Sequence, residues 1–290
     1  MRMNDHERSV QQHYSRGGLL ESILEALQAA GKDPDRLTGD DLLAVDEFHT
    51  RGRVATRELA ALAEFTPGLR VLDVGSGLGG PARFLAAECG CDVTGLDLQP
   101  EFCTVANALS RRSGLGERTR FQQGSALAMP FADGAFDAAW TIQMQMNIAD
   151  KPRLYGEIAR VLRPGGRFVF QDICAGNGEP LHYPVPWASE PAHNHLVSPE
   201  ALRALLGQVG LHEQVWRDIS AQTIAWRKAQ AAKAAARRAT SEPPPALGLH
   251  LVLGERSADK QANSARNAEE GRVRSVQGVF QKPIQPIDIA

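Results

Sequence analysis

The sequence lacks the features that mark several large classes of protein. Four cysteines among 290 residues are too few for a disulfide framework. The pair Cys89 and Cys91 has no second pair at zinc-ligand spacing, so we expect reduced, packed thiols and no metal site. No window approaches the roughly eighteen apolar residues of a membrane span, and residues 1–18 contain no apolar signal-peptide core. We therefore expect a cytoplasmic protein without membrane insertion.

An excess of basic residues is also missing. The formal net charge is −2 at pH 7 and the pI is about 6.5, whereas a protein that neutralises many phosphates needs clustered positive charge. The alanine-rich stretch 221–239 does carry basic residues, which we expect on a solvated helix face: Lys228, Lys233, Arg237 and Arg238. A nucleic acid is therefore not the expected partner.

The chain before residue 65 has the pattern of helices. The apolar residues of "LLESILEAL" recur at helical spacing, and Thr38 is placed to cap a second helix that reaches Phe48. A third helix is expected over "TRELAALAEF". Because this section contains no strand pattern, we expect residues 1–64 to form a helical lid or cap.

From residue 70 the pattern changes to short apolar runs that end in turn residues and alternate with helical windows. Such alternation favours an α/β fold with a parallel sheet. The expected strands are Arg70–Val74, Asp92–Asp97, Thr119–Gln123, Phe136–Thr141, Gly166–Asp172, His212–Asp218 and Arg274–Gln281.

A glycine-rich turn follows the first expected strand, in "VLDVGSGLGG". Gly75, Gly77 and Gly80 fit the G-x-G-x-x-G of a dinucleotide-binding turn. With Gly79 in place of Gly80, the pattern is the G-x-G-x-G of a nucleoside-binding one. The strand, turn and following helix make a nucleotide cradle, and Asp97 at the end of the next strand can accept both hydroxyls of a ribose. Either ligand class fits these features.

Asp73 separates the two ligand classes. It lies two residues before Gly75, where a carboxylate would repel a pyrophosphate that approaches the turn. The same carboxylate suits a ligand that carries ammonium and sulfonium charges and no phosphate. This position therefore argues against an NAD(P)-dependent oxidoreductase, which we keep as the weaker alternative.

Four ordered stretches resemble those of class I S-adenosylmethionine-dependent methyltransferases. They are "VLDVGSGLG" for the first motif, "GLDLQPEF" for the second, "GSALAMPFADGAFDAAW" for the adenine loop and fourth strand, and "ARVLRPGGRFVFQD" for the turn into the fifth strand. The resemblance covers about residues 70 to 172. It is strongest to the small-molecule branch that includes quinone, tocopherol and sarcosine/dimethylglycine methyltransferases.

The resemblance implies a fold, a cofactor and a division of the chain. The fold is a Rossmann-like sheet of seven mostly parallel strands with helices on both faces and an antiparallel last strand. The cofactor is S-adenosyl-L-methionine. The methyltransferase domain then spans residues 65–290, with a substrate insert at 173–198 and a helical excursion at 221–270.

The resemblance also implies a set of cofactor contacts. Asp73, Gly75, Ser76, Gly77 and Gly79 would hold the methionine part, Asp97 the ribose and Leu98 the adenine, and Ser125, Ala126, Gln143 and His49 would complete the site. In many relatives an aspartate stands where this chain has Ser125, and it meets the adenine amino group. A serine can accept one hydrogen bond there but carries no charge.

The insert after the fifth strand concentrates histidine and aromatic residues in the region where α/β folds bind substrate. We expect a general base among His182, Tyr183, His193 and His195, with Trp187 and Tyr14 as walls of the substrate pocket. No carboxylate or cysteine is placed to complete a metal site with these histidines.

The expected activity is transfer of a methyl group from S-adenosylmethionine to nitrogen, oxygen or carbon of a small molecule by in-line displacement. A sulfonium has a neutral leaving group, so the reaction mainly requires a positioned nucleophile in a dry pocket. A non-catalytic sensor or scaffold that binds the same cofactor stays open. The sequence identifies neither the acceptor nor an oligomeric state.

Overall fold

A seven-stranded sheet forms the centre of the computed structural model, which describes residues 5–14, 17–239, 246–254 and 256–284. The strand order is β3-β2-β1-β4-β5-β7-β6. Only the pairs of β7 with β5 and β6 are antiparallel. The expected mostly parallel sheet with an antiparallel last strand is confirmed. The strands are β1 Arg70–Val74, β2 Asp92–Asp97, β3 Thr119–Gln123, β4 Phe136–Ile142, β5 Leu162–Ala175, β6 His212–Asp218 and β7 Val273–Gln281.

Strand β5 is longer than its apolar pattern predicted at both ends. Its antiparallel ladder with β7 runs from Arg167, opposite Gln281, to Ala175, opposite Val273. This pairing extends the strand into residues 173–175, the first part of the expected insert. The extension reflects backbone hydrogen bonding to a distant partner, which the local pattern of β5 does not contain.

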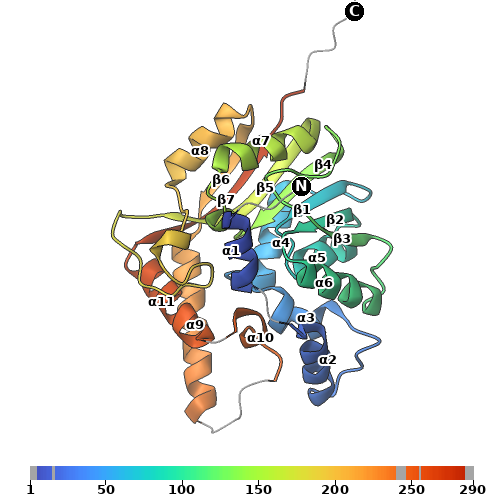
Figure 1. Ribbon diagram of the computed structural model, residues 1–290, viewed down its shortest axis with the longest axis vertical. Helices are drawn as coiled ribbons and strands as arrows, with labels where there is room; N and C mark the ends of the chain where they lie inside the picture. The colour runs from blue at the N-terminus through green and yellow to red at the C-terminus, as the bar shows by residue number, and fades with distance from the viewer. Residues whose placement is uncertain (1–4, 15–16, 240–245, 255, 285–290) are drawn as a thin grey trace, which may run out of the picture.

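Helices cover both faces of the sheet (Figure 1). Helices α7 and α8 pack on one face, and α4, α5 and α6 pack on the other. The helices are α1 Asp5–Tyr14, α2 Leu19–Ala29, α3 Gly39–Asp46, α4 Gly52–Ala63, α5 Gly80–Glu88, α6 Pro100–Arg112, α7 Lys151–Val161, α8 Pro199–Gln208, α9 Ser220–Ala239, α10 His250–Leu253 and α11 Ser257–Glu269, with short 3₁₀ turns η1 Gln145–Asn147 and η2 Pro191–His193.

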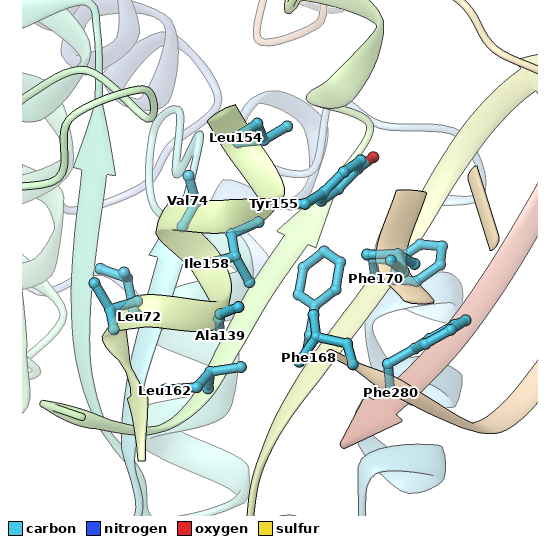
Figure 2. Close-up of a cluster of buried hydrophobic side chains, with 14 of the residues drawn as sticks. Leu72, Val74, Ala139, Leu154, Tyr155, Ile158, Leu162, Phe168, Phe170 and Phe280 are labelled. Atoms are coloured by element: carbon cyan, nitrogen blue, oxygen red, sulfur yellow. The ribbon is translucent and has the colours of Figure 1, made fainter. Parts of the chain in front are cut away.

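Alternate side chains of the central strands enter two separate cores. Leu72 and Val74 of β1 pack toward α7, whereas Val71 faces α4 and α5. Figure 2 shows the first core, in which Phe168 and Phe170 of β5 lie between side chains of α7 and Phe280 of β7. Both faces of β1 are therefore buried, as its continuous apolar run requires.

The front section contains one helix that the sequence pattern missed. The helices expected over residues 18–31, from Thr38 and over 56–65 are present as α2, α3 and α4, and Thr38 forms a capping box with Asp41. Helix α1 was not expected, because its sequence, DHERSVQQHY, has no apolar stripe. Polar contacts to other parts of the chain hold it in place.

Helices α2 and α3 belong to a third core instead of lying loosely over the sheet. Ile23 and Leu27 of α2 are fully buried against residues of α6, including Phe102 and Leu109. Val252 of α10 joins the same core, and Figure 1 shows α10 between α9 and the α2–α3 pair. The N-terminal helices and part of the excursion thus share buried apolar surface.

None of the described helices is both long enough and apolar enough to cross a membrane.

Phe168 provides a test of the first core. Its side chain is 2% exposed and its ring centroid lies 5.1 Å from that of Phe170. We expect Phe168→Ala to lower the free energy of unfolding by about 3–5 kcal/mol, because the cavity left behind cannot collapse fully. Urea denaturation measures the change. Val54→Ala, at a position that is 48% exposed, is the control and should change stability by less than about 0.5 kcal/mol. Equal effects of the two substitutions would contradict this account of the core.

Candidate functional site

A cavity opens at the carboxyl ends of β1, β2 and β4. The strand order reverses between β1 and β4, and this switch point leaves room between the loops that follow the two strands. Residues from these strand ends line the cavity, together with residues of α1, the α3–α4 connection and the insert. It therefore lies where α/β folds of this kind bind ligands.

The glycine turn forms the floor of the cavity, and its conformation requires residues that have no side chain. Gly75 and Gly77 have positive φ values of 76° and 53°. A Cβ on Gly75 would lie 2.4 Å from Met144, and one on Gly77 would lie 2.8 Å from Phe48. Both glycines line the cavity. Only residues without a side chain allow the backbone to adopt this turn and to expose its surface to a ligand.

Gly79 has a different role from the one expected. It does not line the cavity and is the N-cap of α5, with φ of 81°. A Cβ at this position would lie 2.5 Å from the ring of Phe121. Gly79 is needed for close packing of the helix N-terminus on β3, so its contribution to the cavity is indirect.

Asp97 anchors two loops through its carboxylate. Its Oδ2 accepts a hydrogen bond from the backbone N–H of Gly77 at 2.8 Å, and its Oδ1 accepts one from Gln99 at 2.9 Å. Burial raises the pKa of Asp97, and these backbone donors oppose the rise. Each carboxylate oxygen can accept a second hydrogen bond. Asp97 therefore presents an oriented acceptor to the cavity that it lines.

Asp73 is a buried carboxyl group without a compensating partner. It is 2% exposed, and its Oδ2 has no hydrogen-bond partner among the described residues. Burial raises its pKa to about 8, and the nearby charges of Asp97 and Glu47 add to the rise. A cation placed beside it would reverse this shift. The site thus has an acidic position that a positively charged ligand would satisfy.

Two further polar groups of the cavity wall lack partners among the described residues. They are the Ser76 hydroxyl and Nε2 of Gln143. The Gln143 side chain is held by its Oε1, which accepts a hydrogen bond from the backbone N–H of Thr50 at 2.9 Å. With Asp73, these atoms supply donors and an acceptor for a ligand that bears both a cation and an anion, such as an amino acid group.

His49 lines the cavity as a neutral imidazole. Burial lowers its pKa to about 4. Its Nε2 lies 3.1 Å from the carbonyl oxygen of Gly52, which can only accept a hydrogen bond. Nε2 therefore carries the proton, and its N–H donates a hydrogen bond to that carbonyl. His49 is placed in the wall, as expected, but it is not a charged group.

The loop after β3 closes the far end of the cavity. Gly124 donates its backbone N–H to the carbonyl of Asp97 at 2.9 Å, and Leu98, Ser125 and Ala126 line the cavity beside it. The Ser125 hydroxyl donates a hydrogen bond to a carboxylate oxygen of Glu7 in α1. Glu7 was not among the expected residues, since the polar pattern of α1 gives no sign that it folds over this loop.

Much of the cavity wall is apolar. Trp187 and Tyr14, the two expected substrate contacts, line the cavity, and the Tyr14 hydroxyl lies 3.5 Å from Oδ1 of Asn147. Other apolar residues of the wall are Val10, Phe48, Phe102, Met144, Met146, Ile148, Pro186 and Leu253. Such a wall suits an acceptor with substantial apolar surface.

The general base expected in the insert is not at the cavity. None of His182, Tyr183, His193 and His195 lines it. His182 is directed toward α11, where its Nε2 lies 2.8 Å from a carboxylate oxygen of Glu270. The structure therefore does not bring these four predicted catalytic residues to the cavity.

None of the remaining three residues lines the cavity, and each has contacts elsewhere in the insert's surroundings. Tyr183 belongs to a small apolar cluster with Ala268 of α11, and Nε2 of His193 lies 3.3 Å from the Ser9 hydroxyl of α1. His195 contributes its backbone N–H to the carbonyl of Met146 at 3.1 Å. The insert docks on α11 and α1, and only Pro186 and Trp187 reach the cavity.

No group of three or more His, Cys, Asp or Glu side chains that could hold a metal ion occurs among the described residues.

Comparison with known proteins identifies the class of the central part of the chain. Residues 72–170 match the sequence model of a family described as a methyltransferase domain. This matched segment contains the end of β1, the glycine turn, β2 to β4 and most of β5. This central part of the chain is therefore similar to methyltransferase domains.

Curated relatives align mainly with this part of the chain. Methyltransferase GfsG of Streptomyces halstedii is 36% identical over 133 residues, which are 46% of this chain and 48% of that protein. The glycine/sarcosine/dimethylglycine N-methyltransferase of Actinopolyspora halophila is 30% identical over 175 residues, 60% of this chain and 31% of that protein. The chain thus spans about half or less of these relatives' length.

Solved structures share the fold over almost the whole chain. The [4+2]-cyclase SpnF superposes with a TM-score of 0.66, covers 98% of this chain and 99% of that chain, and is 24% identical. This similarity confirms the Rossmann-like methyltransferase fold, including the arrangement of helices around the sheet.

The raised pKa of the buried Asp73 carboxyl group makes the free energy of unfolding depend on pH. Its folded pKa lies near 8, above the usual 3.8, so the folded protein holds a proton that the unfolded chain has lost. The contribution of Asp73 to stability therefore falls as pH rises from about 4 to about 8. We expect Asp73→Asn to remove this fall, so that the stability advantage of the variant grows between about pH 5 and about pH 8.

Thermal unfolding of the ligand-free protein at several pH values measures this difference. Asp92→Asn, at an exposed position at the start of β2, is the matched control and should follow the parent protein. Parallel profiles for the parent and Asp73→Asn would show that Asp73 ionises normally.

Proposed function

We propose that the cavity binds S-adenosylmethionine and that the chain transfers its methyl group to a small-molecule acceptor. The observation that carries this proposal is the pair Asp73 and Asp97 beside the glycine turn, with Asp73 buried and unpartnered at Oδ2. A ligand with a cationic amino acid end and a ribose would satisfy both carboxylates.

Each part of the cofactor has a group in the cavity to hold it. Asp73 would bind the ammonium, and the unpartnered donors of Ser76 and Gln143 would bind the carboxylate of the methionine part. Asp97 would accept from the ribose hydroxyls, and Leu98 would contact the adenine. When bound, the cofactor supplies an electrophilic methyl group on a sulfonium.

The protein's own contribution to the reaction is positioning and exclusion of water. Trp187 and Tyr14, with the apolar residues around them, would hold the acceptor against the cofactor. His49 is neutral and its Nε2 proton is directed to Gly52. None of the insert histidines lines the cavity, so they are not proposed as the general base, and an acceptor that arrives unprotonated needs none.

A nicotinamide dinucleotide fits the cavity less well. Its pyrophosphate would lie beside the carboxylates of Asp73 and Asp97, and no lysine or arginine is among the described residues that line the cavity. Recognition of a pyrophosphate needs donors or cations at this position.

The front section is proposed to act as a cover. Residues 1–64 contribute Glu7, Val10 and Tyr14 of α1, and Phe48 and His49 before α4, to the cavity wall. Residues 65–290 would then form the methyltransferase domain, with the insert and the excursion completing the wall through Trp187 and Leu253.

The reaction itself needs its own test, because the fold does not determine it. SpnF has the same fold and is described as a [4+2]-cyclase, and a protein that only binds the cofactor would have the same turn. The apolar wall beside the cofactor site favours an enzyme, since a sensor does not need a second ligand compartment.

The first measurement is binding by calorimetry. We expect S-adenosylhomocysteine to bind and NAD and NADP not to bind, because the two carboxylates favour a cationic ligand without phosphate. The proposal would be overturned if the protein bound NAD and did not bind S-adenosylhomocysteine.

Asp97→Ala is the informative variant for the same measurement. Loss of hydrogen bonds to the charged carboxylate should weaken S-adenosylhomocysteine binding at least about tenfold. Asp92→Asn on the same strand, with its exposed side chain, should bind as the parent does. An unchanged affinity in Asp97→Ala would mean that Asp97 only ties the two loops.

The second measurement is methyl transfer. The protein is incubated with S-adenosylmethionine labelled in its methyl group and with a metabolite extract, and products are identified by mass. We expect a labelled small molecule that depends on the protein. Trp187→Ala should depress product formation and spare cofactor affinity, because Trp187 lies in the acceptor part of the wall. Tight cofactor binding without any labelled product from varied extracts would favour the sensor or another reaction class.

A further inference from the structure

Glu7 of α1 lies at the end of the cavity that the loop after β3 closes. It is 9% exposed, lines the cavity and accepts the hydrogen bond of the Ser125 hydroxyl. Helix α1 itself is polar. The helix thus brings a carboxylate to the wall that a ligand in the cavity would contact.

The place of Glu7 relative to the cofactor follows from the strand ends. The loop after β3 is tied to the end of β2, since Gly124 donates to the carbonyl of Asp97. A ribose held by Asp97 would direct its base past Leu98 toward Ser125 and Ala126. The exocyclic amine of an adenine is a hydrogen-bond donor, and it needs an acceptor at this end.

Ser125 has little remaining capacity to be that acceptor. Its hydroxyl oxygen accepts the backbone N–H of Leu127 at 3.0 Å, and its proton is donated to Glu7. A carboxylate has two oxygens with about four acceptor sites, so Glu7 can accept the bond from Ser125 together with a bond from a ligand. Glu7 is therefore the stronger acceptor at this position, and Ser125 orients it.

We propose that Glu7 binds the cofactor by accepting a hydrogen bond from the exocyclic amine of adenine. This inference rests on the proposed function, because it concerns the same cofactor. It assigns the recognition of the amine to a residue of the N-terminal helix instead of a residue of the sheet loops.

Recognition by Glu7 would couple the cofactor to the acceptor side of the cavity. Helix α1 is also held by the carbonyl of Gln11, which accepts from Gln99 Nε2 at 2.9 Å, and by His13, whose Nε2 lies 3.0 Å from the carbonyl of Pro186. The same helix places Val10 and Tyr14 in the wall. A cofactor that fixes α1 thus completes the surface on which the acceptor binds.

The test compares two ligands that differ only in the amine. Calorimetry measures the affinity of the full chain for S-adenosylhomocysteine and for its 6-unsubstituted purine analogue, which lacks the exocyclic amine and keeps the ring nitrogen acceptors. We expect the parent protein to prefer S-adenosylhomocysteine about tenfold or more, the change that follows from losing one hydrogen bond to a charged acceptor. In Glu7→Ala the two affinities should become nearly equal.

The ratio of affinities separates recognition from a structural role. If Glu7 only stabilises α1, Glu7→Ala weakens both ligands equally and the parent's preference remains, which overturns the inference. Gln12→Ala, at an exposed position of the same helix, is the control and should keep the preference. Glu7→Gln retains an uncharged acceptor and should keep part of it.

Hydrogen exchange provides a second readout on the same proteins. Addition of S-adenosylhomocysteine should slow amide exchange in α1 of the parent and of Gln12→Ala, but not in Glu7→Ala. Protection of α1 in Glu7→Ala equal to the parent's would also overturn the inference. Failure of the proposed function is distinguishable, because then neither ligand binds the parent protein.

Discussion

Two loops converge on the half-buried carboxylate of Asp97, and the geometry of the whole cavity depends on that convergence. Its two oxygens accept hydrogen bonds from the backbone N–H groups of Gly77 and Gln99, which belong to the loops after β1 and β2. Because the anchor lies at the carboxyl ends of parallel strands, these loops cannot move apart without breaking hydrogen bonds to a charged acceptor. The glycine turn is therefore held open beside β4, where the strand order reverses.

The cavity also concentrates polar groups that the folded chain does not satisfy. Asp73, Ser76 and Gln143 each leave a buried polar atom without a partner among the described residues. Such groups lower stability, and a protein retains them where a ligand supplies the missing contacts. The pKa of Asp73 is raised because its carboxyl group is buried without a cation beside it, so the ligand-free site favours the neutral acid.

The front section combines two kinds of attachment with different physical consequences. Helices α2 and α3 bury apolar side chains against α6, and Arg83 of α5 bonds the buried Asp46 of α3 at 2.7 Å. Helix α1 is attached through polar contacts at its ends and sides, such as those of Glu7 and His13. Apolar burial makes α2 and α3 part of the folded core, whereas the position of α1 depends largely on hydrogen bonds to residues around the cavity.

The sequence alone determined the sheet and the cofactor end of the site, because these depend on local patterns. Apolar runs marked the strands, and the glycine spacing with Asp73 and Asp97 marked the turn, since backbone conformation and charge act within a few residues. Only the tertiary structure decided the rest. Packing of the insert on α11 turned His182 away from the cavity, and the folding of a polar helix over the β3 loop brought Glu7 into it. The spacing of residues in the sequence does not predict where the side chains of His182 and Glu7 lie, because each position depends on contacts between segments more than eighty residues apart.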